Sequence, residues 1–383
     1  MRTNYIRYSG PLFRILSDSQ IDEIKKAASH VMEKTGVAFD TCPEALELLG
    51  NAGADVSDPT RVKIPQHLVE RCLSTAPKTI AIYNREGKPA FTLNGFSGAH
   101  FGGSVGGAEY ADPRTGARRI CYVRDIDDMA KLVDALPNVE WDMTCSTHPT
   151  VPGEIADMVC FMHVMLNMVK PVGLVSNNAA NLKEMLDVGA LVAGSEKALR
   201  EKPFIISTCE PVTPLSQDKD ALEVSMLAAE RGIPNVIYGM PMAGATAPAT
   251  FPGTLAVAIA EVLSHLVVAQ LKNPGAPVVF GSIANAMDMR TCVFPYGAPE
   301  LGFLVAALTE VCHSYGLPMF GTAGCTDSDL MDAQTAAEIT YQILLASLSG
   351  ADLVHDIGLL HSGRLFSAES HTLANDIIGM VNV

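Results

Sequence analysis

Short apolar runs alternate with longer amphipathic stretches over most of this chain. Each apolar run follows a helix stop made by Gly or Asn, and most begin at a proline. Glycine supplies the left-handed turn that closes a helix, and proline is tolerated at the start of a strand, where its missing N–H does least harm. The runs predict strands that begin near residues 139, 171, 204, 234, 277, 318 and 352.

The stretches between these runs have helical periodicity, and several open with an Asp, Ser or Thr cap. The strand starts lie 30 to 43 residues apart, and an eight-unit barrel of ~250 residues needs about 31 per unit. We therefore predict an α/β fold, a (β/α)8 TIM-like barrel, over residues 126–383. A doubly wound sheet is the alternative, but no Gly-x-Gly-x-x-Gly motif follows an early strand. The predicted helices cover residues 153–168, 181–195, 218–231, 252–272, 297–315 and 332–349.

Residues 1–125 have a different pattern. Ser17 to Thr35 predicts a capped helix closed by Gly36, and Pro43 to Ala52 predicts a shorter one. Residues 80–121 form glycine-rich, strand-like runs that predict hairpins. We interpret this segment as a helical and β-hairpin appendage that covers one end of the barrel. The eighth barrel strand is expected either here or beyond residue 383 in a longer parent chain.

Composition narrows the function classes. The chain has 383 residues, 48% of them hydrophobic, and a net charge of −15. That balance disfavours nucleic acid and anionic membrane surfaces as partners. The apolar 252–272 stretch is interrupted by Glu261, Ser264 and His265, which favours a buried helix over a membrane span. Nine cysteines without paired spacing, and no apolar signal region in residues 1–8, predict a cytoplasmic protein.

Five segments carry a family resemblance in their order. They are Gly275–Gly281, Pro295–Glu300, Gly324–Ser328, Asp332–Gln334 with Glu338, and Ser349–Asp352. Together they resemble the trimethylamine methyltransferase superfamily from about Leu16 to the C-terminus. The resemblance implies a β/α barrel that moves a methyl group from a methylated amine to the cob(I)alamin of a separate corrinoid protein. No tightly bound cofactor is expected in this chain, and a homo-oligomer is expected.

The turn from Gly324 to Asp329 bears on the substrate. Members of the superfamily that act on trimethylamine carry pyrrolysine in this turn, at or within a residue or two of Asp329, whereas this chain has ordinary residues. A tertiary amine is a poor methyl donor, while a quaternary ammonium already carries the charge that makes its methyl transferable. The resemblance therefore points to the non-pyrrolysine branch and to glycine betaine or a related betaine. Family members usually continue further at the C-terminus, so we expect a truncated chain.

A quaternary ammonium offers no hydrogen-bond donor, so its site needs aromatic faces and carboxylates. Barrel sites form at the C-terminal ends of the strands. Glu210 and Asp329 are the acidic candidates there, although acids at strand tips are often helix caps. The aromatic candidates are Tyr238, Phe294, Tyr296 and Phe101, the last in a predicted lid, and each could instead be plain packing.

The carboxylate of a betaine needs donors. His355 ends the seventh predicted strand and could bind this carboxylate or shuttle a proton, so Glu210, Asp329 and His355 are our catalytic candidates. A lone histidine is more often structural, and asparagine is common in caps and loops. The other candidate donors are Asn177, Asn285, Arg290, Gln334 and His148.

Other chemistries remain open. Cys145, His148, Cys209, Cys325 and His355 all fall at predicted strand tips, and thiolate with imidazole suits Zn²⁺. No Cys-x-x-Cys or His-x-x-x-His spacing occurs, so no metal is expected. A zinc-dependent or pterin-dependent methyltransferase and a betaine-binding barrel without catalysis are the alternatives.

Overall fold

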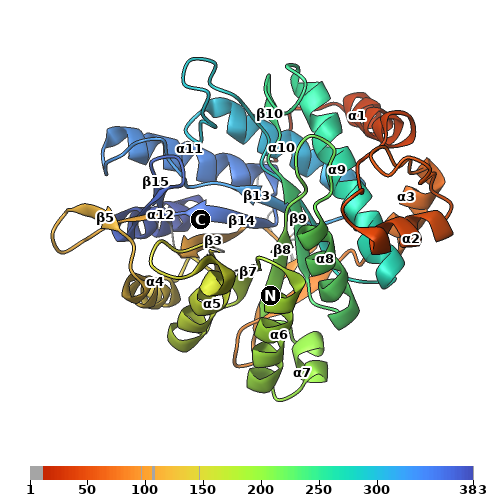
Figure 1. Cartoon of the computed structure of the whole chain (residues 1–383). Coiled ribbons are helices and arrows are strands. Elements are labelled where there is room, and N and C mark those ends of the chain that lie inside the picture. Colours follow the sequence, from red (N-terminus) through yellow and green to blue (C-terminus); the bar gives the residue numbers. More distant parts are fainter. Residues whose placement is uncertain (1–11, 96, 106–107, 146, 383) are drawn as a thin grey trace, which may run out of the picture.

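The barrel is closed and has eight parallel strands (Figure 1). The computed structural model describes residues 12–95, 97–105, 108–145 and 147–382. Seven of the strands begin within two residues of the predicted starts, and the predicted fold is confirmed. In barrel order the strands are β11 (Val278–Ser282), β13 (Met319–Thr322), β14 (Leu353–Ile357), β3 (His100–Val105), β6 (Trp141–Thr144), β7 (Val172–Val175), β8 (Ile205–Cys209) and β9 (Asn235–Gly239).

Helices surround the barrel, and the six that the periodicity predicts are present in the predicted order, together with three described helices that it did not predict. Asn178, Asp218 and Asp332 cap three of them, each accepting hydrogen bonds from backbone N–H groups of the first turn. Glycines in the left-handed conformation close the same three helices. The helices are α4 (Val123–Ala135), α5 (Ala156–Asn167), α6 (Ala179–Ala193), α7 (Glu196–Glu201), α8 (Lys219–Arg231), α9 (Phe251–Lys272), α10 (Pro299–Ser314), α11 (Ala333–Ser349) and α12 (Ala368–Val381).

The eighth strand, β3, comes from the segment that we predicted to be an appendage. It pairs in parallel with β14 and β6, so the predicted lid hairpin at Phe101 is wrong. A Cβ on Gly102 would lie 2.5 Å from Nε1 of Trp141, and one on Gly103 would lie 2.7 Å from Nε2 of His371. These glycines leave room for neighbouring side chains in a strand of the barrel, whereas we had expected this strand-like run to form a hairpin. A domain boundary at residue 125 stays a prediction, but β3 belongs to the barrel.

The N-terminal helices lie on the outside of the barrel against α9 (Figure 1). They are α1 (Asp18–His30), which continues as the π-helix η1 (Val31–Thr35), α2 (Pro43–Asn51) and α3 (Gln66–Thr75). Ser17 and Gln20 form a capping box at the start of α1, and Gly36, with φ of 83°, ends the helix as predicted. In the described part of the chain, α9 alone is long and apolar enough to cross a membrane, and 94% of its most apolar window is buried inside the protein. The signal-region prediction for residues 1–8 falls outside the described residues.

An antiparallel hairpin closes the N-terminal end of the barrel. It consists of β1 (Ile80–Tyr83) and β2 (Pro89–Leu93), confirming one predicted hairpin. Backbone hydrogen bonds join it to Pro203 and Val169, which lie just before barrel strands. Asp352, just before β14, accepts hydrogen bonds from the backbone N–H groups that follow β2. The opposite, C-terminal end is left as the open one.

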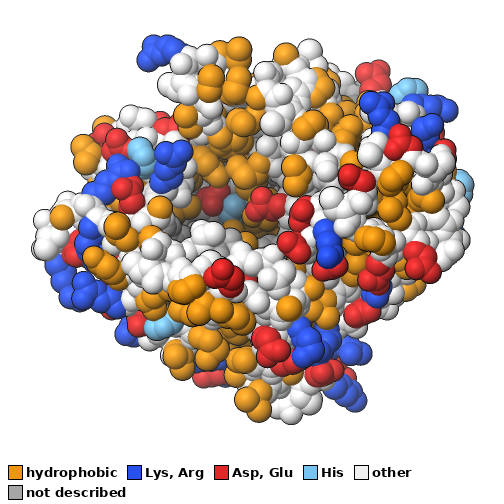
Figure 2. All heavy atoms as spheres, viewed as in Figure 1, with side chains coloured by type: hydrophobic (Ala, Val, Ile, Leu, Met, Phe, Trp, Pro, Cys, Tyr) orange, Lys and Arg blue, Asp and Glu red, His pale blue; other side chains and the backbone are white. Residues whose placement is uncertain are grey.

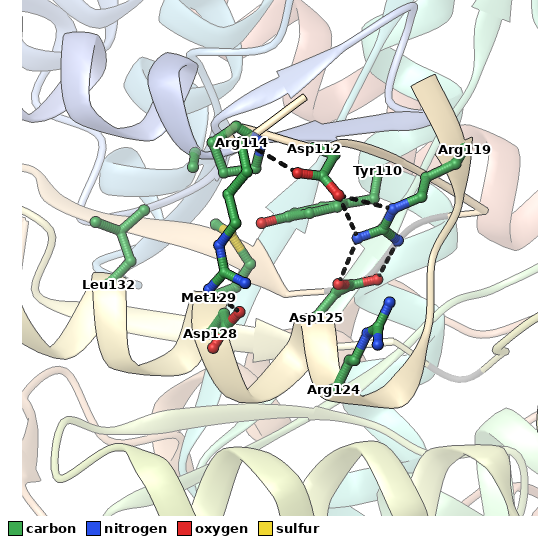
Figure 3. A pocket seen from close by; sticks show the side chains of 11 residues that line it. Tyr110, Asp112, Arg114, Arg119, Arg124, Asp125, Asp128, Met129 and Leu132 are labelled. Carbon is green, nitrogen blue, oxygen red and sulfur yellow. Dashed lines mark hydrogen bonds and ion pairs between the residues drawn. The ribbon is translucent and has the colours of Figure 1, made fainter. Parts of the chain in front are cut away.

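A small side sheet flanks β14 and α4. It contains β4 (Glu109–Ala111), β5 (Arg118–Ile120), β15 (Leu359–Leu360) and β16 (Leu365–Ser367). Arg119 of β5 donates to Asp125 of α4 at 2.6 and 2.9 Å and to Asp112 at 3.1 Å, inside a surface pocket of about 410 Å³ (Figure 3). Two carboxylates thus pair with this one guanidinium. These ion pairs connect the β4–β5 hairpin to α4, so we interpret the pocket as structural. The remaining short elements are η2 (Gly153–Ile155), β10 (Met242–Ala243) and β12 (Asn285–Ala286).

Candidate functional site

The inside of the barrel is apolar toward the N-terminal end of its strands. Alternate residues of each strand point inward, and one buried cluster contains Trp141, Val236, Val279, Phe320 and Leu353 together with the β1–β2 hairpin. At the C-terminal end the strands continue into loops, and the molecular surface is hollowed between them (Figure 2). Acidic and histidine side chains are visible inside this hollow, and apolar side chains surround it (Figure 2).

Glu210 directly follows β8 at this mouth. The residue is exposed at the mouth, and the protein around it removes part of the hydration of the carboxyl group, which raises its pKa. A hydrogen bond from Tyr238 and the proximity of His355 oppose that rise, whereas Asp356 adds to it. Tyr238 is 4% exposed, and burial followed by the charge of Glu210 raises its pKa well above the ordinary value. The neutral phenol is therefore the form that faces Glu210.

His355 and Asp356 end β14 on the floor of the same cavity. Nδ1 of His355 lies 2.9 Å from Oδ1 of Asp356, and Thr322 donates to Oδ2 of Asp356 at 2.6 Å. The imidazole stacks on Phe320, with ring centroids 4.4 Å apart and planes 14° apart. Both ring nitrogens of His355 are buried without a hydrogen bond in the described structure, and Nδ1 has only the close contact with Asp356. A buried imidazole nitrogen of this kind is a vacant contact for a ligand.

Asp356 is a site residue that we did not predict. It is 5% exposed and adopts φ of 77°, a conformation that non-glycine residues rarely take. Such strain persists where the surrounding structure enforces it, often at binding sites. The available signal was its position directly after His355 at a strand end.

Two aromatic residues complete one wall. Phe294 and Tyr296, from the loop between β12 and α10, have ring centroids 4.9 Å apart and pack against the inner barrel cluster. Burial, and after it the charge of Asp356, raises the pKa of Tyr296 well above its ordinary value. The site therefore combines two carboxylates, two phenol rings and one histidine. Of the predicted residues, Glu210, Tyr238, Phe294, Tyr296 and His355 are brought together.

Three predicted residues lie at the rim or on the outside. Asp329 has a 59% exposed side chain that pairs with His361 and, at 3.7 Å, with Arg118. The structure therefore does not place this candidate beside Glu210. Gln334 is exposed and donates to Glu338 at 2.8 Å, and Arg290 is exposed in the loop after β12.

Four others have structural surroundings. Asn177 bonds to Asp157 and Gly153 within loops, and the amide of Asn285 donates to the carbonyl of Pro295 at 2.6 Å. His148 interacts with Thr150 at 3.1 Å. Its charged neighbours, Asp125 and His163, belong to α4 and α5 rather than to the cavity. Phe101 is completely buried in the outer cluster, because its side chain points away from the barrel interior.

The residues of the zinc alternative are dispersed. Cys145 faces Cys160 with sulfur atoms 3.2 Å apart, and Cys209 lies 3.5 Å from Nε2 of His265 behind the barrel wall. Over residues 12–382, apart from the undescribed positions, no three His, Cys, Asp or Glu side chains are grouped as metal ligands would be. The donor set for zinc is therefore not assembled in the described structure.

Known proteins with similar sequences are methyltransferases. The family model described as trimethylamine methyltransferase (MTTB) matches residues 1–383. A trimethylamine methyltransferase MttB of Desulfitobacterium hafniense is 34% identical over 372 residues, which cover 95% of this chain and 73% of the relative. A glycine betaine methyltransferase from another strain of that organism is 29% identical over 376 residues, covering 97% and 77%.

One solved structure has the same fold. The monomethylamine methyltransferase of Methanosarcina barkeri superposes with a TM-score of 0.62 at 11% sequence identity, covering 97% of this chain and 75% of that one. At this identity the likeness supports the barrel fold alone. The match of the family model over the whole chain, together with the identity to the first relative, shows more: this chain is a methyltransferase that belongs to the trimethylamine methyltransferase (MTTB) family.

Proposed function

We propose that this protein transfers a methyl group from a quaternary amine, glycine betaine or a related betaine, to the corrinoid of a separate protein. The observation that carries the proposal is the cavity at the mouth, where Glu210 and Asp356 lie beside the phenol rings of Tyr238 and Tyr296. A permanent cation is recognised by this combination of charge and aromatic faces. The glycine betaine methyltransferase among the relatives supports the same substrate class.

The chain contributes binding and orientation to the reaction. Cob(I)alamin of the partner protein supplies the nucleophile that accepts the methyl group. The N–CH₃ bond breaks with its electrons on nitrogen, which leaves as a neutral tertiary amine, so no residue needs to move a proton. Holding the ammonium group in one orientation in the cavity lowers the barrier by fixing the geometry of attack. Glu210 and Asp356 hold the cation, and the aromatic wall sets its position.

The rim of the cavity suits a protein partner. Large apolar side chains are exposed on several loops that follow the barrel strands, and exposed apolar patches of this kind often mark interaction sites. They include Val212, Phe251, Met289, Val293, Leu330 and Met331. A corrinoid protein that covers this rim would present its cofactor to the cavity floor.

The test of this function is the choice between quaternary and tertiary amines. We expect demethylation of glycine betaine and little of trimethylamine, because the turn from Gly324 to Asp329 has no pyrrolysine. Initial rates with each amine and a cob(I)alamin acceptor measure this. Equal or faster turnover of trimethylamine would contradict the proposal. Betaine binding without turnover by a reduced corrinoid partner would favour the non-catalytic barrel, and tight binding of methyltetrahydrofolate would favour the pterin-dependent alternative.

His355→Ala is expected to weaken glycine betaine binding ~10- to 100-fold, the effect of losing a hydrogen bond to a charged ligand. Nε2 of His355 is buried without a hydrogen-bond partner, and an imidazole N–H at this position would donate to the substrate carboxylate. Tetramethylammonium has no carboxylate, so we expect its affinity to change little. Calorimetric titration of both ligands, with a melting curve of the variant, makes the comparison. An equal loss for both ligands would assign His355 to the cation or to the fold.

A further inference from the structure

Asp327 binds the backbone of the loop that carries Phe294 and Tyr296, the two residues of the aromatic wall. Its Oδ1 accepts the N–H of Tyr296 at 2.9 Å, and its Oδ2 accepts the N–H of Gly297 at 2.8 Å. Ser362 donates a further hydrogen bond to Oδ1 at 2.6 Å. Both carboxylate oxygens are therefore used to hold consecutive peptide groups of a loop that belongs to another barrel unit. Asp327 itself lies in the turn between β13 and α11.

Two side chains of α11 add hydrogen bonds to the same loop and to the turn that contains Asp327. Gln342 donates to the carbonyl of Tyr296 at 2.9 Å and to the carbonyl of Cys325 at 2.8 Å. Glu338 accepts the N–H of Asp327 at 3.0 Å. The carboxyl group of Glu338 occupies the position that a Cβ on Gly297 would take, so a larger residue here would displace that carboxyl group. Both peptide groups of Tyr296 are thus fixed by the β13–α11 turn and its helix.

These contacts do not extend to the neighbouring acid of the turn. Asp329, two residues later, points to Arg118 and His361 at the rim. The turn therefore reaches the cavity through Asp327 and the loop that it holds.

We propose that Asp327 is a positioning residue that sets the ring of Tyr296 against the cationic head of the substrate, a role that rests on the proposed function. A cation–π contact depends on where the cation lies over the ring face. Loss of the hydrogen bonds between Asp327 and the loop would let the loop and its ring shift while leaving the cavity acids in place.

Asp327→Asn is the informative change. The amide keeps the size of the side chain but has one acceptor oxygen, and its NH₂ group would face a backbone N–H. One of the two backbone hydrogen bonds is therefore lost. Asp58→Asn is the matched control, because Asp58 also accepts a backbone N–H and a hydroxyl, from Thr60, in an exposed turn of the N-terminal segment.

The first readout compares a cation with its neutral isostere. Glycine betaine and 3,3-dimethylbutanoate have the same shape and carboxylate, but the second has carbon in place of the charged nitrogen. We expect Asp327→Asn to weaken glycine betaine binding about 2- to 30-fold, the range of a cation–π contact, and to change 3,3-dimethylbutanoate binding less than twofold. In a Tyr296→Leu background, Asp327→Asn should add nothing. Equal losses for both ligands, or additive losses in the double variant, would overturn the positioning role.

The second readout needs no ligand. In protein labelled with 3-fluorotyrosine, the ¹⁹F resonance that disappears in Tyr296→Phe belongs to Tyr296. We expect Asp327→Asn to shift or broaden this resonance and Asp58→Asn to leave it unchanged. An unmoved resonance in Asp327→Asn overturns the proposal. Failure of the unaltered protein to bind any betaine would instead contradict the proposed function, and the resonance would still decide the role of Asp327.

Discussion

Glu210→Gln is expected to lower the affinity for glycine betaine ~10- to 100-fold and to lower turnover at least as much. The amide is nearly isosteric, so the change removes the negative charge while keeping the shape of the site. Two unit charges 4 Å apart attract each other by about 1 kcal/mol in water and by about 4 kcal/mol at the effective dielectric near a protein surface, and the expected loss lies between these limits. Calorimetric titration and initial rates measure both quantities. Glu154→Gln, an exposed glutamate in the loop after β6, is the control that should change neither.

The same residue predicts a pH dependence with a definite sign. Burial raises the pKa of Glu210 above that of an ordinary glutamate, and only the carboxylate form attracts the cation. Affinity should therefore be full above the raised pKa and should fall as the pH decreases through it, at a higher pH than an ordinary glutamate would titrate. Glu210→Gln should remove this step from the profile. A profile that is identical in the variant would show that another group controls binding.

The barrel could be predicted because its signals are local. Gly350, for example, closes α11 and precedes β14, and Gly232 in the same way closes α8 and precedes β9. Predicted strands also give the positions of their C-terminal ends. Glu210 and His355 could therefore be predicted as site residues, because the first directly follows a predicted strand and the second ends one. Parallel strands bring their C-terminal ends together whatever lies between them. Strand periodicity thus carries information about the site as well as the fold.

The other site residues could not be predicted, because their positions depend on loop and turn conformations that the pattern of apolar residues does not indicate. Asp327 and Asp329 are two residues apart in one turn, yet the first binds the loop of Tyr296 and the second faces solvent at the rim. Turn conformation decides this, and the order of residues does not reveal it. Asp356 reaches the cavity through a positive φ, which a residue type other than glycine does not signal. The strand-like run of β3 was assigned to a hairpin rather than to the barrel because Trp141 and His371, whose side chains need the space at its glycines, lie far away in the sequence.

Gly102→Ala tests that explanation of β3 and is expected to lower the free energy of unfolding by ~1–3 kcal/mol, the usual cost of overpacking a core. The new Cβ would lie 2.5 Å from Nε1 of Trp141. The indole cannot easily move away, because it is completely buried and donates to the carbonyl of His100 at 3.0 Å. Melting temperature, followed by circular dichroism, measures the effect.

Gly153→Ala separates this clash from the general consequence of adding a methyl group to glycine. No atom outside its immediate chain neighbours lies within 4 Å of a Cβ on Gly153, in the loop after β6. In a loop, alanine restricts the unfolded chain more than glycine does, so the control should be neutral or slightly stabilising. If Gly102→Ala melted at the same temperature as Gly153→Ala, Trp141 would have room to shift. The glycines of β3 would then need another explanation than the space that neighbouring side chains require.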